Sequence, residues 1–136
     1  MKNTLVRLTL ALSVVTAGVL VQVEAQLLPP SDGGMAMGHV LLNVSDVDAH
    51  KNFWIRQFDA KPVNVGKLQG VTIPGVIILF RLQERTGPSE GTTINHMGLK
   101  LRKLADYTAR FDSAGLKHDP PRVGRESTPQ TYVTGP

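Results

Sequence analysis

The stretch "GHVLLNVSDVDAHKNFW", residues 38–54, decides the fold because a strand pattern in it runs directly into a helix pattern. Successive side chains of a strand point to opposite faces. One face therefore holds Val40, Leu42 and Val44, and the other holds His39, Leu41 and Asn43. Ser45 then offers a helix N-cap, and Asp46 and Asp48 suit the first helical turn. We predict a strand whose apolar face is covered by the helix that follows it.

The residues after this helix predict a small antiparallel meander. Asp59–Pro62 ends the helix, since the residue before a proline avoids helical geometry. The runs "KPVNVGKLQ" (61–69) and "GVTIPGVIILFRLQ" (70–83) are rich in Val and Ile and are broken by Gly and Pro. This pattern is typical of two or three short strands joined by turns. On the helix itself, we expect His50 to make a helix–sheet contact.

The same order of elements starts again further along the chain. Placing His39 on His96 (96 − 39 = 57) matches four further positions without a gap. These are Leu42 with Leu99, Val44 with Leu101, Val47 with Leu104, and Trp54 with Phe111. The repeat predicts a second helix that turns Leu104, Thr108 and Phe111 inward and ends at Gly115. It also predicts that the two first strands lie side by side, with His39 and His96 pointing into one cleft. His118 would be an exposed turn residue.

Length, charge and composition exclude several classes of protein. The 136 residues are enough for one domain. The formal charge of +4 comes from scattered Lys and Arg, with one tight group at Lys100, Arg102 and Lys103, so we expect no nucleic-acid partner. The chain has no cysteine, which excludes disulfides and thiol chemistry.

The first 25 residues have the three parts of a secretory signal peptide. Lys2 and Arg7 form a positive start, Leu8–Val21 is an apolar run, and Val23–Ala25 is a small-residue cleavage site. We therefore expect export, to a periplasm or out of the cell, with membrane contact only through this segment. An uncleaved N-terminal anchor is the alternative. Residues 26–37 are expected to form an irregular leader.

From about Gly38 onward the chain resembles the vicinal oxygen chelate superfamily, which includes glyoxalase I, bleomycin- and fosfomycin-resistance proteins and extradiol dioxygenases. The stretches "GHVLLNVSDVDAHKNFW" and "NHMGLKLRKLADYTARFDSAGLK" (95–117) carry the resemblance, each with a histidine-headed strand followed by a helix. The resemblance implies an α+β fold in which paired βαβββ modules form an open, incomplete barrel. Module one would span 38–83, a loop 84–92, and module two 93–136, with the second module truncated at its last strand.

The resemblance also implies a metal site, which metal-dependent members build from two histidines on the first strands and two carboxylates on the last strands of the modules. His39 and His96 fall on the histidine positions, and a divalent Zn, Ni, Mn or Fe ion would suit such a site. Leu41, Asn43 and Lys100 share the histidine face and would contact the ligand. No catalytic residue is assigned.

The expected carboxylates depart from the family pattern. No Asp or Glu occurs from Ala60 to Gln83, and Ile78 or Leu79 occupies the expected acidic position. Glu84 and Glu90 lie beyond the strand and would serve only in a shifted register. The second module stops at "TYVTGP", before the acid-bearing strand of the family. Two imidazoles alone make a weak zinc site, since tight sites use three or four protein ligands.

Two functions from different classes therefore stay open. The first is an exported glyoxalase- or dioxygenase-like enzyme, with a metal on His39 and His96 for lyase, isomerase or dioxygenase chemistry on a small oxygen-bearing substrate. The second is a metal-free module of the bleomycin-resistance type that binds a small-molecule ligand, or an inactive truncated member. An unpaired strand edge at 130–133 would favour a homodimer that completes the sheet.

Overall fold

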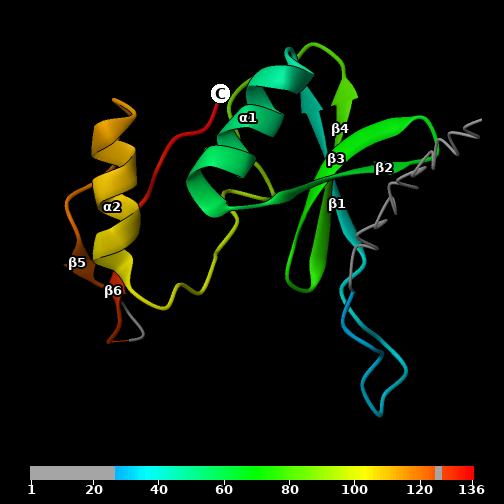
Figure 1. Ribbon diagram of the computed structural model, residues 1–136, viewed down its shortest axis with the longest axis horizontal. Helices are drawn as coiled ribbons and strands as arrows, with labels where there is room; N and C mark the ends of the chain where they lie inside the picture. The colour runs from blue at the N-terminus through cyan, green and yellow to red at the C-terminus, as the bar shows by residue number, and fades with distance from the viewer. Residues whose placement is uncertain (1–26, 125–126) are drawn as a thin grey trace, which may run out of the picture.

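The computed structural model describes residues 27–124 and 127–136, so the predicted signal segment 1–25 lies outside the described residues. Figure 1 shows a sheet covered by one helix, with a second helix and a short hairpin beside them. The elements in chain order are β1 (His39–Val44), α1 (Val47–Phe58), β2 (Lys61–Val65), β3 (Leu68–Ile73), β4 (Val76–Leu82), α2 (Leu104–Ser113), β5 (Arg122–Val123) and β6 (Pro129–Gln130). Residues 27–38 form no helix or strand. Neither helix of the described part is long and apolar enough to span a membrane.

The four-stranded sheet has the order β1-β4-β3-β2. Strand β4 lies between β1, its parallel neighbour, and β3, its antiparallel neighbour. The predicted meander is confirmed, because β2, β3 and β4 follow one another as antiparallel neighbours. Gly66 and Gly75, at φ 59° and 86°, supply the left-handed residues that the two tight turns require. Strand β4, the last strand of the first unit along the chain, is thus an interior strand that joins β1 to the meander.

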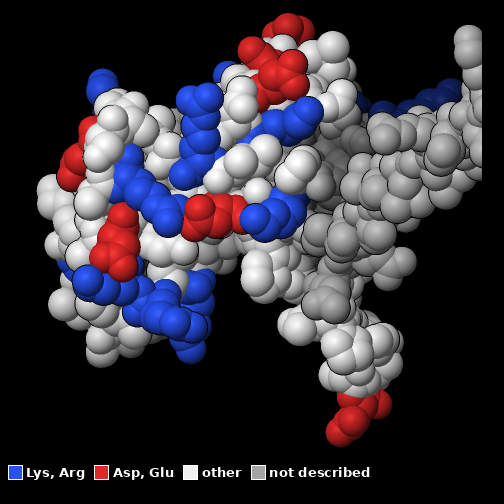
Figure 2. Space-filling view, viewed as in Figure 1, with Lys and Arg blue, Asp and Glu red and all other residues white. Residues whose placement is uncertain are grey.

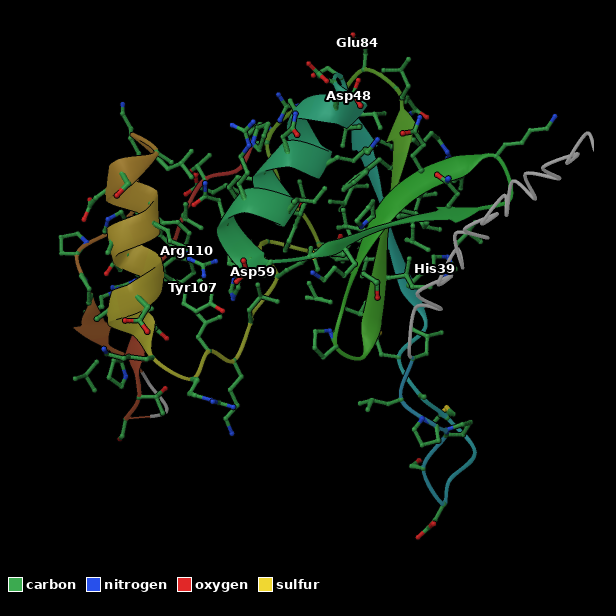
Figure 3. The ribbon with its side chains drawn as sticks, viewed as in Figure 1. His39, Asp48, Asp59, Glu84, Tyr107 and Arg110 are labelled. Carbon is green, nitrogen blue, oxygen red and sulfur yellow. The ribbon has the colours of Figure 1, made fainter. Side chains whose placement is uncertain are left out.

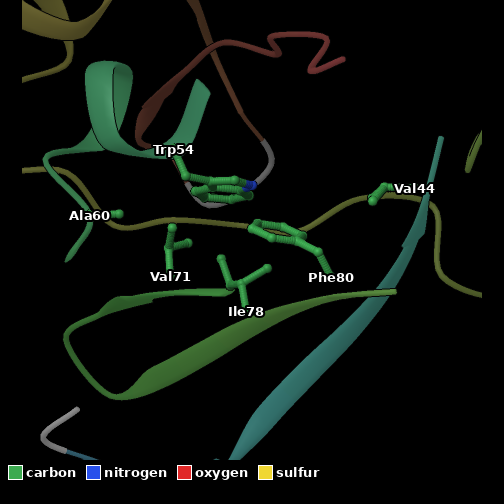
Figure 4. Packing of buried hydrophobic residues seen from close by; sticks show 6 residues of the cluster. All are labelled: Val44, Trp54, Ala60, Val71, Ile78 and Phe80. Carbon is green, nitrogen blue, oxygen red and sulfur yellow. The ribbon is translucent and has the colours of Figure 1, made fainter. Parts of the chain in front are cut away.

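Helix α1 covers one face of this sheet and closes the main core (Figure 4). The buried residues of this core are Val44, Trp54, Ala60, Val71, Ile78 and Phe80. Val44 is 1% exposed, and Leu42 packs against the cluster, so the prediction that the apolar face of the first strand meets the helix is confirmed. His50 contacts the sheet as predicted, with its ring centroid 5.6 Å from that of Phe80. Burying side chains of this size supplies most of the driving force for folding the first unit.

The helix ends follow from two aspartates. Asp46, not the predicted Ser45, is the N-cap of α1, because its carboxylate accepts a 2.9 Å hydrogen bond from the Ala49 backbone N–H. Ser45 lies one residue outside the helix. At the other end the helix stops where predicted, since Asp59 adopts the left-handed conformation at φ 53°.

Helix α2 begins where the repeat places it, 57 residues after α1 (104 − 47 = 57). Phe111 is 2% exposed and lies against Phe58 of α1, with ring centroids 5.8 Å apart. Gly115, at φ 67°, donates its backbone N–H to Asp112, and Leu116 donates to Phe111. These two bonds form a Schellman motif, and the predicted C-terminal glycine is confirmed.

The predicted first strand of the second unit is not formed. Residues 94–103 have no strand, and β1 has β4 as its neighbour in the described sheet rather than the stretch around His96. Strand β1 pairs with β4 along one edge, and the stretch around His96 forms no ladder with the other edge. The described residues hold no counterpart of β4 in the second unit, so the stretch has no partner strand.

The rest of the second unit is a short hairpin. Strands β5 and β6 pair antiparallel, and an isolated bridge joins His118 to Val133. His118 was expected to be an exposed turn residue, but its backbone forms this bridge and its side chain is only 13% exposed. The predicted α+β class is confirmed in a partial form, with one mixed four-stranded sheet, two helices and no closed barrel in the described part.

Candidate functional site

The strand register assembles a second face on the sheet, on the side away from α1, which we call the distal face. Residues paired across neighbouring strands point to the same side, so three rows cross this face. The rows are His39, Ile77, Thr72 and Lys61, then Leu41, Leu79, Gly70 and Val63, then Asn43 and Arg81. An apolar middle row therefore lies between two rows that carry polar side chains.

Burial follows the same division. His39, Asn43, Lys61 and Arg81 are exposed, whereas Leu79 is 4% exposed. Gly70 has no room for a side chain, because an added Cβ would meet the carbonyl oxygen of Ile78 and the side chain of Leu79. The face thus has a packed apolar floor and exposed polar ends.

The sequence predicts His39, Leu41 and Asn43 correctly as neighbours on one face of β1. Lys100 and His96 were expected to join them from the second unit, but both lie in the stretch 94–103, which is not a strand. The His96 ring packs edge-on against Tyr132, with centroids 5.3 Å apart, and its Nδ1 lies 3.1 Å from the Asn95 side-chain oxygen. Both of these contacts are to residues of the second unit, and a shared role with His39 stays a prediction.

Ile78 and Leu79, the two candidates for the position where a carboxylate was expected, lie on opposite faces of β4. Ile78 faces α1 and is buried in the core, so Leu79 rather than Ile78 occupies the distal face of β4. Glu84 lies beyond the opposite end of the sheet from His39 (Figure 3). His39 pairs with Ile77, which precedes Glu84 by seven residues (84 − 77 = 7). At the rise of a strand, this spacing places His39 and Glu84 about 20 Å apart. Glu84 does not supply the missing oxygen ligand beside His39.

The donor set therefore does not fit the metal site that the resemblance implies. The distal residues of β4 are Ile77, Leu79 and Arg81, of which none is an oxygen ligand. In the described ranges 27–124 and 127–136, no three His, Asp or Glu side chains gather closely enough to hold a metal ion. No step of a mechanism can be derived through a metal from these residues.

Sequence reasoning missed a polar cluster at the second helix. The two ring nitrogens of His118 face two acceptors, the Asp119 carbonyl oxygen at 2.9 Å and an Asp112 carboxylate oxygen at 3.1 Å. Two acceptors suit a doubly protonated imidazole, and the hydrogen bond to Asp119 followed by that to Asp112 raises the pKa of His118. The ring lines a pocket of about 470 Å³ whose other lining residues include Lys117, Tyr132 and Thr134. No sequence motif marks this cluster, because the end of α2 and the bridge between His118 and Val133 bring it together.

A second polar contact joins the two helices. Arg110 of α2 donates to the Asp59 carboxylate at 2.7 Å and to the Gln57 carbonyl oxygen at 3.2 Å, and the labelled pair point toward each other in Figure 3. The hydrogen bond to Asp59 raises the pKa of Arg110. This contact links α2 of the second unit to the end of α1 in the first unit. It is not part of the distal face.

Charged side chains are mixed over the view of Figure 2, where Lys and Arg alternate with Asp and Glu across α1 and α2. The four strands contrast with this surface, since β1, β2, β3 and β4 contain no Asp or Glu at all. Neither face of the described sheet therefore has a carboxylate from its strands, and the charged groups of the distal face are Lys61 and Arg81.

No family model and no curated protein matches the chain. Among solved structures, it is similar to an integron cassette protein from the mobile metagenome of V. cholerae, at 17% identity and a TM-score of 0.56, covering 75% of this chain and 88% of that one. It is also similar to a lactoylglutathione lyase from Agrobacterium tumefaciens, at 16% identity and a TM-score of 0.53, covering 79% and 88%. A fosfomycin resistance protein from Mesorhizobium loti follows at 18% identity and a TM-score of 0.50, covering 75% and 91%. At such identities the likeness concerns the fold.

Proposed function

We propose, starting from a fold shared with the vicinal oxygen chelate superfamily, that this chain binds a small oxygen-bearing molecule on its distal face without a metal. The observation that carries the proposal is the composition of this face. Its middle row includes the half-buried Leu41 and Val63, and its outer rows offer exposed hydrogen-bonding groups, His39 and Asn43 among them. Sites for small molecules combine these same two elements, a mostly apolar surface and a few placed polar groups.

The test maps binding on the protein itself. The full chain is titrated with catechol, lactate and glycolate, three small molecules with neighbouring oxygens, while amide shifts are followed by NMR. We expect the largest shifts along β1 and β4. Leu41→Trp should remove them by covering the middle row, whereas Ile94→Trp, at a side chain 70% exposed and outside the sheet, should leave them unchanged. Shifts confined to the hairpin around His118 would contradict the proposal.

A metal held jointly by His39 and His96 is the competing proposal, and the family resemblance supports it. It predicts binding of Zn, Ni, Mn or Fe(II) at micromolar concentration or tighter, lost in both His39→Ala and His96→Ala. Thr93→Ala, at an exposed residue near His96, serves as the control. We expect no such binding, because the distal face lacks the oxygen ligands that complete a site. Calorimetric titration of the parent chain decides between the two proposals.

Export and self-association are further parts of the proposal. The charge and apolar pattern of residues 1–25 supports secretion with cleavage after Ala25, which mass spectrometry of the exported protein would test. The second edge of β1 has no neighbour in the described sheet, so a second copy could pair there. Sedimentation of the protein over a range of concentrations would measure this association.

A further inference from the structure

We propose that residues 96–101, which we call the docking edge, bind an extended acidic segment of another protein that adds to them as a β-strand. In Figure 1 this stretch belongs to the yellow connection that leads to the start of α2. The docking edge lies outside the four-stranded sheet, so the proposal does not depend on a ligand of the distal face. It follows from the backbone, the packing and the charge of this stretch.

The backbone of the docking edge has no partner in the described structure. Residues 96–101 belong to no ladder or bridge, and no hydrogen bond joins their backbone to another described residue. Each of these residues carries one backbone N–H donor and one C=O acceptor. A row of such unpaired groups along an extended segment is a template on which a strand from another chain can pair.

Packing against the first unit gives the docking edge the alternating burial of a strand. Met97 and Leu99 pack against the main core. The residues between and beside them, which are exposed, are His96, Gly98 and Lys100. At Gly98 nothing lies within 4 Å of an added Cβ, so the middle of the exposed row has room for a side chain of the partner. Because the core already holds the segment in place, pairing costs this protein little further chain entropy.

The charges beside the exposed row favour an acidic partner. Residues 91–105 contain no Asp or Glu, and their Lys and Arg residues are Lys100, Arg102 and Lys103. Lys103 is paired with Asp106 at 3.1 Å. Lys100 and Arg102 are exposed, and neither forms an ion pair with a described residue. A strand with acidic residues at alternate positions presents them on one face about 7 Å apart, where they attract these two cations.

Nucleic acid is the other polyanion that exposed Lys and Arg attract. It is bound mainly through its phosphates, by basic side chains gathered on one surface. Residues 96–103 offer only two cations outside ion pairs with described residues, and both signs of charge are mixed over the view of Figure 2. A nucleic acid would also leave the backbone of the docking edge without strand pairing. These observations favour a peptide.

Two peptides of the same composition separate strand addition from attraction by charge. The probe is acetyl-VEVEVEV-amide, and the control, acetyl-EEEVVVV-amide, lacks the alternation. Each is titrated into the full chain by calorimetry, and amide hydrogen exchange is followed by NMR. We expect the probe to bind at least about tenfold more tightly than the control, since several hydrogen bonds together exceed the energy of one tenfold step. Exchange should slow at the amides of residues 96–101.

Variants of the protein and of the probe test the two parts of the contact. Lys100→Glu should weaken binding of the probe about tenfold, because like charges then face each other. Lys67→Glu makes the same change at an exposed residue between β2 and β3 and should have no effect. Two further probes carry N-methyl groups on all Glu or on all Val residues. Alternate N–H groups of a strand point to the same edge, so at least one of these probes should lose its binding.

Each other result overturns the proposal. Equal affinity for the probe and the control, or equal losses in Lys100→Glu and Lys67→Glu, would show attraction by net charge alone. Unchanged hydrogen exchange at residues 96–101, full binding of both N-methylated probes, or no binding of the probe at all would refute strand addition. Tighter binding of a short oligothymidine than of the probe would identify a surface for nucleic acid instead. All of these outcomes leave the proposed function of the distal face standing.

Discussion

The two units of this chain carry the same alternating pattern in their first segment but only one of them forms a strand. Residues 39–44 pair along their whole length with β4, whereas residues 94–103, matched to them by the repeat, remain outside any sheet. The apolar positions agree, and the difference lies in the partner. The first unit supplies a central strand, and the described part of the second unit does not. An alternating apolar pattern thus shows that a segment can form a strand, but the segment forms one only where a partner strand is present.

The two units also differ in what buries their largest apolar residues. Phe80 and Phe111 are each 2% exposed. Phe80 lies in a sheet–helix core with many strand residues around it, whereas Phe111 lies between two helices and beside His118. The two phenylalanines are therefore equally buried for different reasons. Phe80 is covered by the sheet and helix of the first unit, whereas Phe111 is covered by a few side chains of α1 and the second unit.

The largest expected effect tests this difference directly. Phe80→Ala should lower the free energy of unfolding by about 3–5 kcal/mol, the usual cost of removing a buried phenylalanine. Phe111→Ala should cost the whole protein less, because the second unit can open while the first remains folded. Urea unfolding and hydrogen exchange measure both. A loss of protection throughout the sheet in Phe111→Ala would show that the two units unfold as one.

A smaller effect is expected from adding a methyl group in each unit. Gly70→Ala should destabilise by about 1–3 kcal/mol, since the new Cβ meets the backbone of β4 and overpacks the sheet. Gly98→Ala is the matched change in the second unit, where nothing lies within 4 Å of the added atom. It should be neutral or slightly stabilising by up to about 1 kcal/mol, because alanine restricts the unfolded chain. Similar urea midpoints for the two variants would contradict the difference in packing.

The smallest effect is a pH dependence of opposite sign in the two units. Hydrogen bonds to Asp119 and Asp112 raise the pKa of His118 above its ordinary 6.5. The stabilisation by His118 is therefore fully present below pH 6.5 and is lost as the pH rises through the raised value. His118→Gln should remove this part of the pH profile, measured as urea midpoints from pH 5 to 8.

His50 provides the contrast in the first unit. Burial, and then the nearby Arg85, lower the pKa of His50 below its ordinary 6.5. The folded state binds this proton more weakly than the unfolded state, so stability falls as the pH drops below 6.5. His50→Gln should flatten the acid side of the profile and leave the alkaline side unchanged. NMR titration of the two rings, with His118 titrating above His50, provides the direct check.

Most of the first unit could be predicted from the sequence, because its signals are local. The alternation of residues 39–44, the proline after Asp59 and the glycine-broken Val/Ile runs each act within a few residues. The predicted N-cap was wrong by one residue, Ser45 instead of Asp46. Both side chains can accept a hydrogen bond from a backbone N–H of the first turn, and only the backbone geometry determines which of them does. Helix α2 and its Gly115 end were equally predictable for the same reason.

The predictions that failed depend on contacts between distant residues. Assigning a strand to 96–101 required a partner strand that the sequence pattern does not reveal. The position of His118 depends on the bridge to Val133 and on the end of α2, neither of which is visible in the turn that contains it. The choice between Ile78 and Leu79 on the distal face needed the register with β3, because a shift of one residue exchanges the two faces of a strand.

Asp59 serves two purposes that compete for the residue type. It ends α1 in a left-handed conformation, where glycine is the least strained choice, and its carboxylate holds Arg110 of the following unit. Glycine there would ease the turn but remove the carboxylate that holds Arg110, and an apolar residue would remove it while keeping the strain. The contact between the two units is thus made by a side chain that the helix end alone would not favour, so this position accepts a strained backbone in return for an ion pair with the second helix.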